Sequence, residues 1–427
     1  MLRSNNSLNK VKIHVRRTIH QQMKNELLTH ELQQVALKGE MKMKIKLGII
    51  GIGNMGTVHS KNIFEGKCPE IELCAVCDLK DEKVEWIKNE HPEVAIFKDA
   101  EEMMDSGLID SILIAVPHYD HPKYAIMAME KGLHTMVEKP AGVYTKQVKE
   151  MNEIADKCNV KFALMMNQRT NCIYRKMREI VKSGELGAIK RTSWIVTDWY
   201  RPQAYYDSGD WRATWTGEGG GVLLNQCPHN LDLWQWICGM PKKIHAKMHF
   251  GKWHNIEVED DVTAYCEYEN GATGTFITST GDAPGTNRFE ILLEGGKLLA
   301  EEGKLHLWKN QISEPEFSRT NEVAFAAPPM DYILVETDGK NEQHVGVLNA
   351  FAGAILRNEP LVADGREGIN GLTISTAMHL SGVFGKEIDL DTFDDDMFYE
   401  ELKKRIATSR RKENVKEARV DMGDSFR

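Results

Sequence analysis

The chain has 427 residues, a formal net charge of −9, 41% hydrophobic and 27% charged residues. This length suits more than one core, because single domains usually hold roughly 100–200 residues. The acidic balance argues against nucleic acid as a partner, because phosphate binding needs clustered Lys and Arg. No apolar run reaches the roughly 18 residues of a membrane span. We therefore expect a cytoplasmic protein with no membrane partner.

Residues 1–43 differ in composition from the rest of the chain. They are basic and polar, and Leu28, Leu32 and Val35 lie at helical spacing. One interpretation is an amphipathic helix for a partner or a membrane surface. The favoured interpretation is an extension outside the core fold.

From residue 44 onward, apolar strand-like runs alternate with helical segments. The runs are KIKLGIIGIG, IELCAVCD, VAIFKD, SILIAVP, HTMVEKP and KFALMMN. Strands that alternate with helices are typical of a parallel sheet covered by helices. We therefore predict an α/β fold whose residues 44–166 form a doubly wound Rossmann domain.

Residues 167–395 have a different pattern. Strand-like segments follow one another closely, with few helices between them: RTSWIVTDWY, KKIHAKMHF, DVTAYCEYEN, ATGTFITST, NRFEILLEGG and KLHLWKN. This predicts an α+β domain with a large, mostly antiparallel sheet. Helices at about 171–183, 228–238 and 345–357 are expected to cover one face. Residues 396–427 are expected to be a C-terminal helix and a polar tail.

A glycine-rich turn follows the first strand and opens a helix. It matches G-x-G-x-x-G and consists of Gly51, Ile52, Gly53, Asn54, Met55 and Gly56. In this context the three glycines make the tight turn, admit a pyrophosphate to the backbone and let helix and strand pack closely. The helix N-terminus then faces the phosphates.

Asp78 ends the second strand, at the spacing that this fingerprint requires. A carboxylate there accepts ribose hydrogen bonds and repels a 2′-phosphate, so NAD is predicted in preference to NADP. Lys80 keeps NADP as the second choice, because a cation accommodates that phosphate. The alternative is a glycine turn with a surface aspartate.

The run Glu138-Lys139-Pro140 ends a later strand. Strand ends of this kind face the ligand crevice. Lys139 could hydrogen-bond a substrate hydroxyl and the cofactor ribose, and burial would lower its pKa toward the range of acid–base work. Glu138 could orient it. The alternative is a surface ion pair.

Three glycines at 219–221 precede Asn225 and His229, which share one helix face. A histidine can relay a proton from a hydroxyl. The alternative makes Asn225 an N-cap and His229 a satisfied core residue. Asp232 either orients His229 or is structural.

The segment 199–215 is dense in aromatic residues and arginines, including Tyr200, Trp211 and Arg212. Sugars stack on aromatic rings and arginine binds hydroxyls, so these three are candidate substrate-binding residues. A protein interface is the alternative of equal weight.

Together, GIGNMG, EKP and GGG…N…H…D resemble the Gfo/Idh/MocA oxidoreductases, a family named after glucose–fructose oxidoreductase and inositol dehydrogenase. The similarity runs from about Lys44 to about Leu390. It implies two domains, NAD(P) on the first, and Lys139 and His229 as the proton-handling pair. The family often has Asp where this chain has Asn225, so Asn225 is left with hydrogen bonding to substrate.

The resemblance also assigns residues around the cofactor. Pro117 and His121, on the loop after a sheet strand, are implied to lie beside the nicotinamide. Gln168 and Arg169, at the domain junction, are implied to serve cofactor or substrate. The family commonly associates through its sheet, and an uncovered face with alternating apolar residues is an association surface. We therefore expect a homodimer or homotetramer.

The predicted function is NAD-dependent hydride transfer between nicotinamide and a secondary hydroxyl of a sugar, cyclitol or glycoside. One alternative is a glycoside-cleaving enzyme that oxidises its substrate transiently and eliminates the aglycone. Another is a non-catalytic NAD-binding regulatory protein. No metal is predicted, because Cys74 and Cys77 lie in an apolar run without a second pair at zinc-site spacing.

Overall fold

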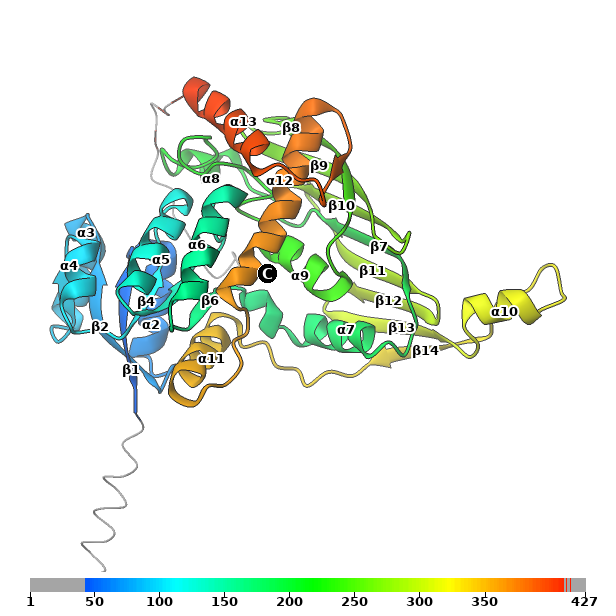
Figure 1. Ribbon diagram of the computed structural model, residues 1–427, viewed down its shortest axis with the longest axis horizontal. Coiled ribbons are helices and arrows are strands. Elements are labelled where there is room, and N and C mark those ends of the chain that lie inside the picture. Colours follow the sequence, from blue (N-terminus) through cyan, green and yellow to red (C-terminus); the bar gives the residue numbers. More distant parts are fainter. Residues whose placement is uncertain (1–42, 411, 413–414, 416–427) are drawn as a thin grey trace, which may run out of the picture. The chain divides into compact units, whose positions relative to one another are not determined.

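The computed structural model describes residues 43–410, 412 and 415 (Figure 1). The expectations for the N-terminal extension and for the polar end of the tail lie outside these residues. The described chain from Ile45 onward belongs to one compact unit that contains two sheets. No helix within the described ranges is both long and apolar enough to cross a bilayer.

The first sheet has six parallel strands in the order β3-β2-β1-β4-β5-β6. Their bounds are β1 Ile45–Ile50, β2 Ile71–Cys77, β3 Ala95–Phe97, β4 Ser111–Ile114, β5 His134–Val137 and β6 Phe162–Leu164. Strands β4 and β6 are buried at every residue, as expected for strands covered on both faces. The strand order reverses between β1 and β4, where doubly wound sheets open a ligand crevice. The predicted Rossmann-type sheet is confirmed.

Five helices connect these strands: α2 Asn54–Phe64, α3 Asp81–Glu90, α4 Ala100–Asp105, α5 His121–Glu130 and α6 Thr145–Lys157. Helix α6 buries Val148, Met151 and Ala155, which follow the helical repeat and form its core stripe. Helix α4 was not predicted, because its six residues are too few to show a period. Its N-cap, Asp99, accepts a hydrogen bond from the Glu102 amide.

The second sheet has nine strands in the order β14-β13-β12-β11-β7-β10-β9-β8-β15. Their bounds are β7 Ile189–Val196, β8 Lys243–Phe250, β9 Glu259–Glu267, β10 Thr273–Ser279, β11 Asn287–Leu293, β12 Gly296–Glu301, β13 Lys304–Asn310, β14 Met330–Val335 and β15 Ile388–Asp389. All pairs are antiparallel except β7 with β10. The predicted large, mostly antiparallel sheet is confirmed.

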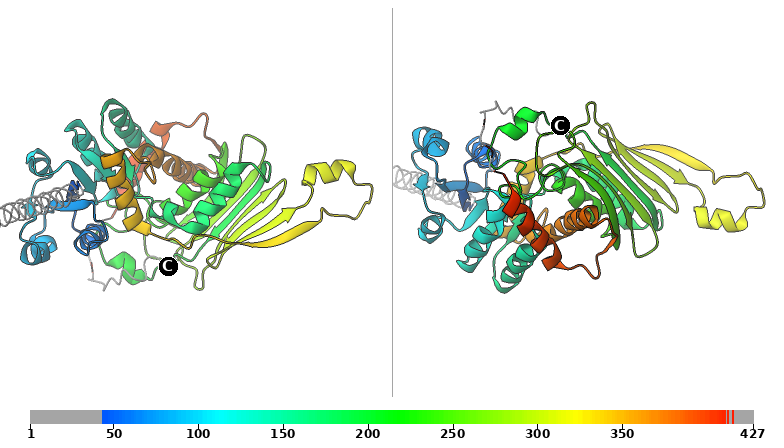
Figure 2. Two further views of the ribbon diagram at one scale, coloured as in Figure 1. Left: turned by 90° about the horizontal axis from the view of Figure 1, so that it is seen from below. Right: turned by 90° about the horizontal axis from the view of Figure 1, so that it is seen from above.

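Helices cover one face of this sheet (Figure 2): α7 Cys172–Ser183, α9 Pro228–Cys238 and α12 Gly368–Phe384. The expectation that a helix at 345–357 would join them was wrong. That segment is α11 (Gln343–Arg357), and its buried Val347, Leu348 and Phe351 belong to the core around β1 of the first sheet. Its apolar stripe therefore packs against the first sheet. Helix α12 covers the second sheet in place of the helix expected at 345–357.

The opposite face of the second sheet carries alternating strand residues that stay accessible. In β9, Val262, Ala264 and Cys266 are buried, whereas Thr263 and Tyr265 between them are exposed. At the edge of the sheet, β13 and β14 lead to the projecting α10 (Glu314–Thr320) (Figure 1). The remaining helices are α8 Gln203–Asp207 and α13 Asp395–Thr408, with short 3-10 turns η1 His118–Asp120, η2 Asn167–Thr170 and η3 Gly365–Glu367.

Candidate active site

The three motif glycines occupy three different environments at the end of β1. A Cβ on Gly51, which has φ +88°, would lie 2.5 Å from the Ala115 carbonyl oxygen. A Cβ on Gly56 would lie 1.9 Å from the Gly51 oxygen, whereas Gly53 has open space around it. Gly51 and Gly56 are thus needed by the fold, and Gly53 keeps the N-terminus of α2 accessible. The first-turn N–H groups of a helix have no internal acceptor, so this end fits a pyrophosphate.

Asp78 is half-buried at the end of β2 and binds this turn. Its Oδ2 accepts a hydrogen bond from the Ile52 amide at 2.8 Å, and its Oδ1 accepts one from the Lys80 amide at 2.9 Å. A carboxylate has further lone pairs, which suit ribose hydroxyls. The nearby Lys98 ammonium is 2.7 Å from Asp81, so its charge is already paired.

Glu138 lies almost fully buried at the end of β5 and pairs with a histidine from α2. Its Oε1 is 2.6 Å from His59 Nε2, and its Oε2 accepts a hydrogen bond from the Lys139 amide. Burial disfavours its charge, but the hydrogen bond and charge of His59, with the charges of His344 and Lys139, bring the pKa of Glu138 to about 2. Glu138 is therefore a permanent anion directly behind Lys139.

Lys139 extends from the first sheet to the loop before α9. Its Nζ donates to the Asn225 carbonyl oxygen at 3.2 Å. Burial lowers the pKa of Lys139, although the charges of Glu138 and Glu218 raise it. The half-buried Lys139 side chain is thus influenced by two carboxylates.

His229 lies buried in the first turn of α9. Burial, with the charge of Lys139 next, lowers the pKa of His229 to about 3, so the ring is neutral at pH 7. Its Nδ1 has no hydrogen-bond partner among the residues that the structure describes. The structure thus brings Lys139, Asn225 and His229 together, and the buried Nδ1 fits a hydroxyl of a bound molecule.

Three neighbours of this group were missed from the sequence. His59 and His344 pack edge to face at 5.5 Å, and Glu218 lies under Asn225, whose side-chain amide donates to its carboxylate. His59 follows Gly56 by less than one turn of α2, and Glu218 directly precedes the three glycines, which were the available signals. No pattern pointed to His344, because only the packing of α11 brings it here.

The aromatic segment reaches the loop that follows β4. Arg212 donates to the Tyr205 hydroxyl at 2.9 Å and stacks on the Trp211 ring at 4.6 Å. The ring of His118 lies 6.3 Å from the Trp211 ring. Tyr200 is 47% exposed, and its carbonyl oxygen accepts a hydrogen bond from Arg201. The substrate role of Tyr200, Trp211 and Arg212 stays a prediction.

Arg169 is held by two acidic side chains. Its guanidinium is 2% exposed, forms a two-fold hydrogen bond with Asp232 at 2.7 and 2.6 Å, and bonds Glu367 at 2.7 Å. These carboxylates hold the guanidinium inside the protein, and its role toward a substrate stays a prediction. Asp232 consequently serves Arg169 and does not orient His229.

The remaining predicted cofactor residues lie around these groups. His121 is buried, with its ring nitrogens 2.7 Å from the Pro140 oxygen and 2.8 Å from the Val116 oxygen. It braces the Lys139–Pro140 turn against the loop where Pro117 caps η1. Gln168 donates to the Gln343 side chain at 3.3 Å. Direct contact of these side chains with a cofactor stays a prediction.

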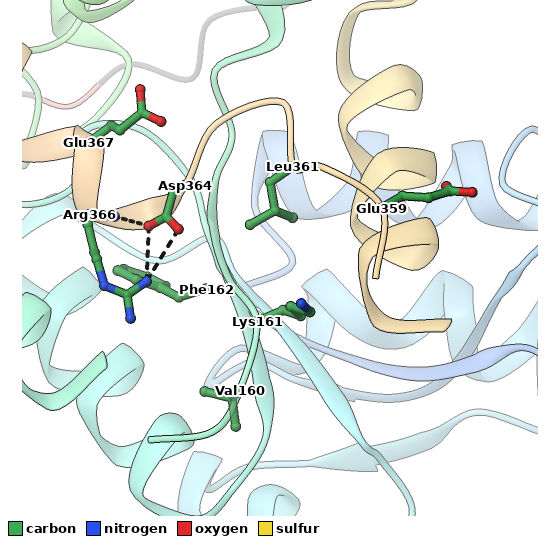
Figure 3. Close-up of a pocket in the computed structure, with 8 residues that line it drawn as sticks. All are labelled: Val160, Lys161, Phe162, Glu359, Leu361, Asp364, Arg366 and Glu367. Atoms are coloured by element: carbon green, nitrogen blue, oxygen red, sulfur yellow. Dashed lines mark hydrogen bonds and ion pairs between the residues drawn. The ribbon is translucent and has the colours of Figure 1, made fainter. Parts of the chain in front are cut away.

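A surface pocket of about 360 Å³ lies apart from this constellation (Figure 3). It is lined by Val160, Lys161, Phe162, Glu359, Leu361, Asp364, Arg366 and Glu367. Arg366 is paired with Asp364 and Asp156, and Lys161 donates to Asn358. Lys161 and Arg366 are therefore paired within the protein, and Lys139, Asn225 and His229 are not among the residues that line the pocket.

A doubly wound sheet with a glycine turn at its switch point, and a buried lysine and histidine beside it, defines a dinucleotide-dependent oxidoreductase. The chain belongs to the Gfo/Idh/MocA family. The model of the oxidoreductase family with an NAD-binding Rossmann fold matches residues 45–166, and the model of the Gfo/Idh/MocA C-terminal domain matches residues 174–299.

Known proteins resemble almost the whole described chain. D-glucoside 3-dehydrogenase of Escherichia coli is 23% identical over 81% of this chain and 97% of its own length. Myo-inositol 2-dehydrogenase of Thermotoga maritima is 20% identical over 78% of this chain and 95% of its own. The WlbA dehydrogenase of Bordetella pertussis, solved with NADH and UDP-GlcNAcA, covers 82% of this chain and 99% of its own, with a TM-score of 0.69 and 24% identity. This last likeness shows the fold.

Proposed function

We propose that this enzyme transfers hydride between the nicotinamide of NAD and a secondary hydroxyl of a sugar, cyclitol or glycoside. One observation carries the proposal: Nζ of Lys139 from the first sheet reaches the Asn225 carbonyl just before α9, whose buried His229 has an Nδ1 that lacks a partner in the described chain. The relatives named for D-glucoside and myo-inositol act on polyols, which supports this substrate class.

The residues of the site have different roles, and the pKa values of Lys139 and His229 decide which of the two accepts the proton. The glycine turn and the N-terminus of α2 would hold the pyrophosphate, and Asp78 would accept hydrogen bonds from the ribose, which favours NAD over NADP. Bound NAD supplies the hydride acceptor. Burial lowers the pKa of Lys139, which makes Nζ the group that takes the hydroxyl proton. His229, with a pKa of about 3, is a neutral imidazole at pH 7 and orients the hydroxyl by accepting its hydrogen bond at Nδ1.

The test is a panel of myo-inositol, D-glucose, methyl glucosides and related polyols with NAD, read by the absorbance of NADH. At least one polyol should give steady accumulation of NADH. Turnover of a glycoside without accumulation would show transient oxidation and cleavage instead. No reaction across the panel, with NAD still bound, would show a regulatory protein.

We further infer that the enzyme works in the cytoplasm as a homodimer or homotetramer. The uncovered face of the second sheet, with Tyr265 exposed on a central strand, supports association. We also propose a division into a nucleotide domain at 44–166 and a substrate and oligomerisation domain at 167–395. The two matched models, which meet between residues 166 and 174, support this boundary.

A further inference from the structure

A carboxylate outside the predicted catalytic pair lies in the same site. Glu218 is 2% exposed, and its Oε2 accepts a hydrogen bond from the Ala213 amide at 2.7 Å. Its Oε1 accepts one from the side-chain amide of Asn225. Within the described part of the chain, no Lys or Arg approaches it closely enough for an ion pair. A buried carboxylate held only by amides is costly, so its retention at this place calls for a role.

Asn225 connects this carboxylate to the catalytic lysine. Its side-chain Nδ2 donates to Glu218, while its backbone oxygen accepts from Lys139 Nζ at 3.2 Å. Because Nδ2 is held by Glu218, the amide oxygen Oδ1 is directed away from the carboxylate. Asn225 is half-buried and Glu218 is fully buried, so Asn225 is the member of the pair that a bound molecule can reach.

We propose that Glu218 is a positioning residue of the active site, which fixes the Asn225 amide with its oxygen toward the substrate and places a negative charge beside Lys139. Asn225 then supplies the acceptor oxygen for the substrate hydroxyl, and Glu218 supplies the negative charge. A single carboxylate at this position would supply both. This inference rests on the proposed function, because it assigns the two residues to the same hydroxyl-binding site.

Protonation of Glu218 would reverse the arrangement. A neutral carboxyl has one O–H, which needs an acceptor. If the Asn225 side-chain amide flips, its Oδ1 faces Glu218 and accepts this hydrogen bond. Burial raises the pKa of Glu218 to about 7, against the lowering effects of the Ala213 amide, Arg212, Asn225 and Lys139. The amide therefore changes orientation in the physiological range. The charged and titratable groups around Glu218 are Arg212, Lys139, His118, Tyr205, Tyr206 and Lys412.

The test transfers the negative charge from position 218 to position 225. Glu218→Gln keeps an acceptor for Ala213 but donates to Asn225, so it imitates the protonated state. It should lower kcat/KM about 10- to 100-fold, the loss expected for one hydrogen bond to a charged group. Asn225→Asp alone puts two carboxylates side by side and should lose a similar factor. The double variant Glu218→Gln/Asn225→Asp restores one charge and one donor, and should return to within about tenfold of the wild type.

The pH profile separates this role from a structural one. The wild type should lose kcat/KM as the pH falls through about 7, and Glu218→Gln should lack this limb. NAD should bind both proteins equally in a fluorescence titration. Asp210→Asn, which removes an exposed carboxylate of the same segment, is the matched control and should leave kcat/KM unchanged. An unaffected Glu218→Gln, or a double variant as inactive as the singles, would overturn the inference.

A second readout needs no substrate, so the inference and the proposed function can fail separately. If the wild type oxidises none of the polyols, the proposed function fails, and thermal unfolding still tests the charge. A pKa raised above its ordinary value of about 4.3 means that the folded protein binds the proton more tightly than the unfolded chain. The melting temperature of the wild type relative to Glu218→Gln should therefore fall as the pH rises from about 4.5 to 7. A constant difference would contradict a titrating carboxylate at this position.

Discussion

Burial lowers the pKa of both Lys139 and His229 but gives them different roles. Both lose pKa on burial, but the lysine begins far above neutrality and the histidine just below it. Lowering the first favours proton acceptance at Nζ, whereas lowering the second leaves a neutral hydrogen-bond acceptor. Glu138, held by His59, keeps the lysine from losing its proton too easily.

Lys139→Ala and His229→Ala should therefore differ in kind. Loss of the proton acceptor should lower kcat by about 10²–10⁴-fold, the usual range for acid–base catalysis. His229→Ala should lower kcat/KM while NAD affinity stays near the wild-type value, because His229 belongs to α9. Steady-state kinetics and NAD titration measure both. Lys123→Ala, at an exposed lysine of α5, is the control, and near-normal kcat in Lys139→Ala would refute the assignment.

Asp78→Ser should weaken NAD binding by about 10- to 150-fold, because a hydrogen bond to a charged acceptor contributes roughly 1.5–3 kcal/mol. It should also reduce the preference for NAD over NADP, since the charge that repels a 2′-phosphate is gone. Kinetics with both cofactors check this. A wild type that prefers NADP would contradict the role given to Asp78.

At this scale, sequence reasoning found the residues whose motifs are local and missed those assembled by folding. Lys139 and His229 stand within short recognisable runs. The His59–Glu138 contact joins residues 79 positions apart, and the contact of Lys139 with Asn225 spans 86. The ion pairs of Arg169 were missed for the same reason, because its partners Asp232 and Glu367 are distant in the chain.

Among the elements, the β1–α2 turn has the tightest geometry. Two of its glycines are required by neighbouring backbone, whereas Gly53 has open space where the pyrophosphate is proposed to bind, so substitutions should separate stability from binding. Strand and helix periods predicted most elements of both sheets correctly. They placed α11 wrongly, because an apolar stripe shows that a helix is buried but not against which sheet. The edge strand β14 was missed, because five of its six residues are exposed and it has no core face to leave a pattern.

Gly53→Ala and Gly56→Ala form a matched pair that tests this turn. The added methyl of Gly53→Ala meets open space, so the melting temperature should change little while NAD affinity falls. In Gly56→Ala the methyl would lie 1.9 Å from the Gly51 oxygen, so the turn must shift and stability should fall by at least about 2 kcal/mol. Thermal unfolding and NAD titration separate the two effects. Equal stability of both variants would contradict the described packing.

For the whole molecule, two sheets share one site. The first sheet leads to the glycine turn and Lys139, helix α9 on the second sheet supplies His229, and the loop before α9 supplies the Asn225–Glu218 pair. We propose that the uncovered face of the second sheet serves association between subunits.

Light scattering at micromolar concentration should report a dimer or tetramer. Tyr265→Asp should shift it toward the monomer, because a charge on the central strand β9 would be buried without a partner. The exposed Lys123→Ala variant should leave the assembly unchanged. A wild type that is only monomeric would contradict association through this face.

The central claim is that a carbohydrate hydroxyl carbon gives its hydride to nicotinamide beside Lys139. Its most direct test is a single turnover with a polyol deuterated at the oxidised carbon, followed by mass spectrometry of the cofactor. The account predicts deuterium in the nicotinamide ring of NADH, formed more slowly in Lys139→Ala by the factor that kcat loses. Oxidation of the polyol with no deuterium in the cofactor would contradict it.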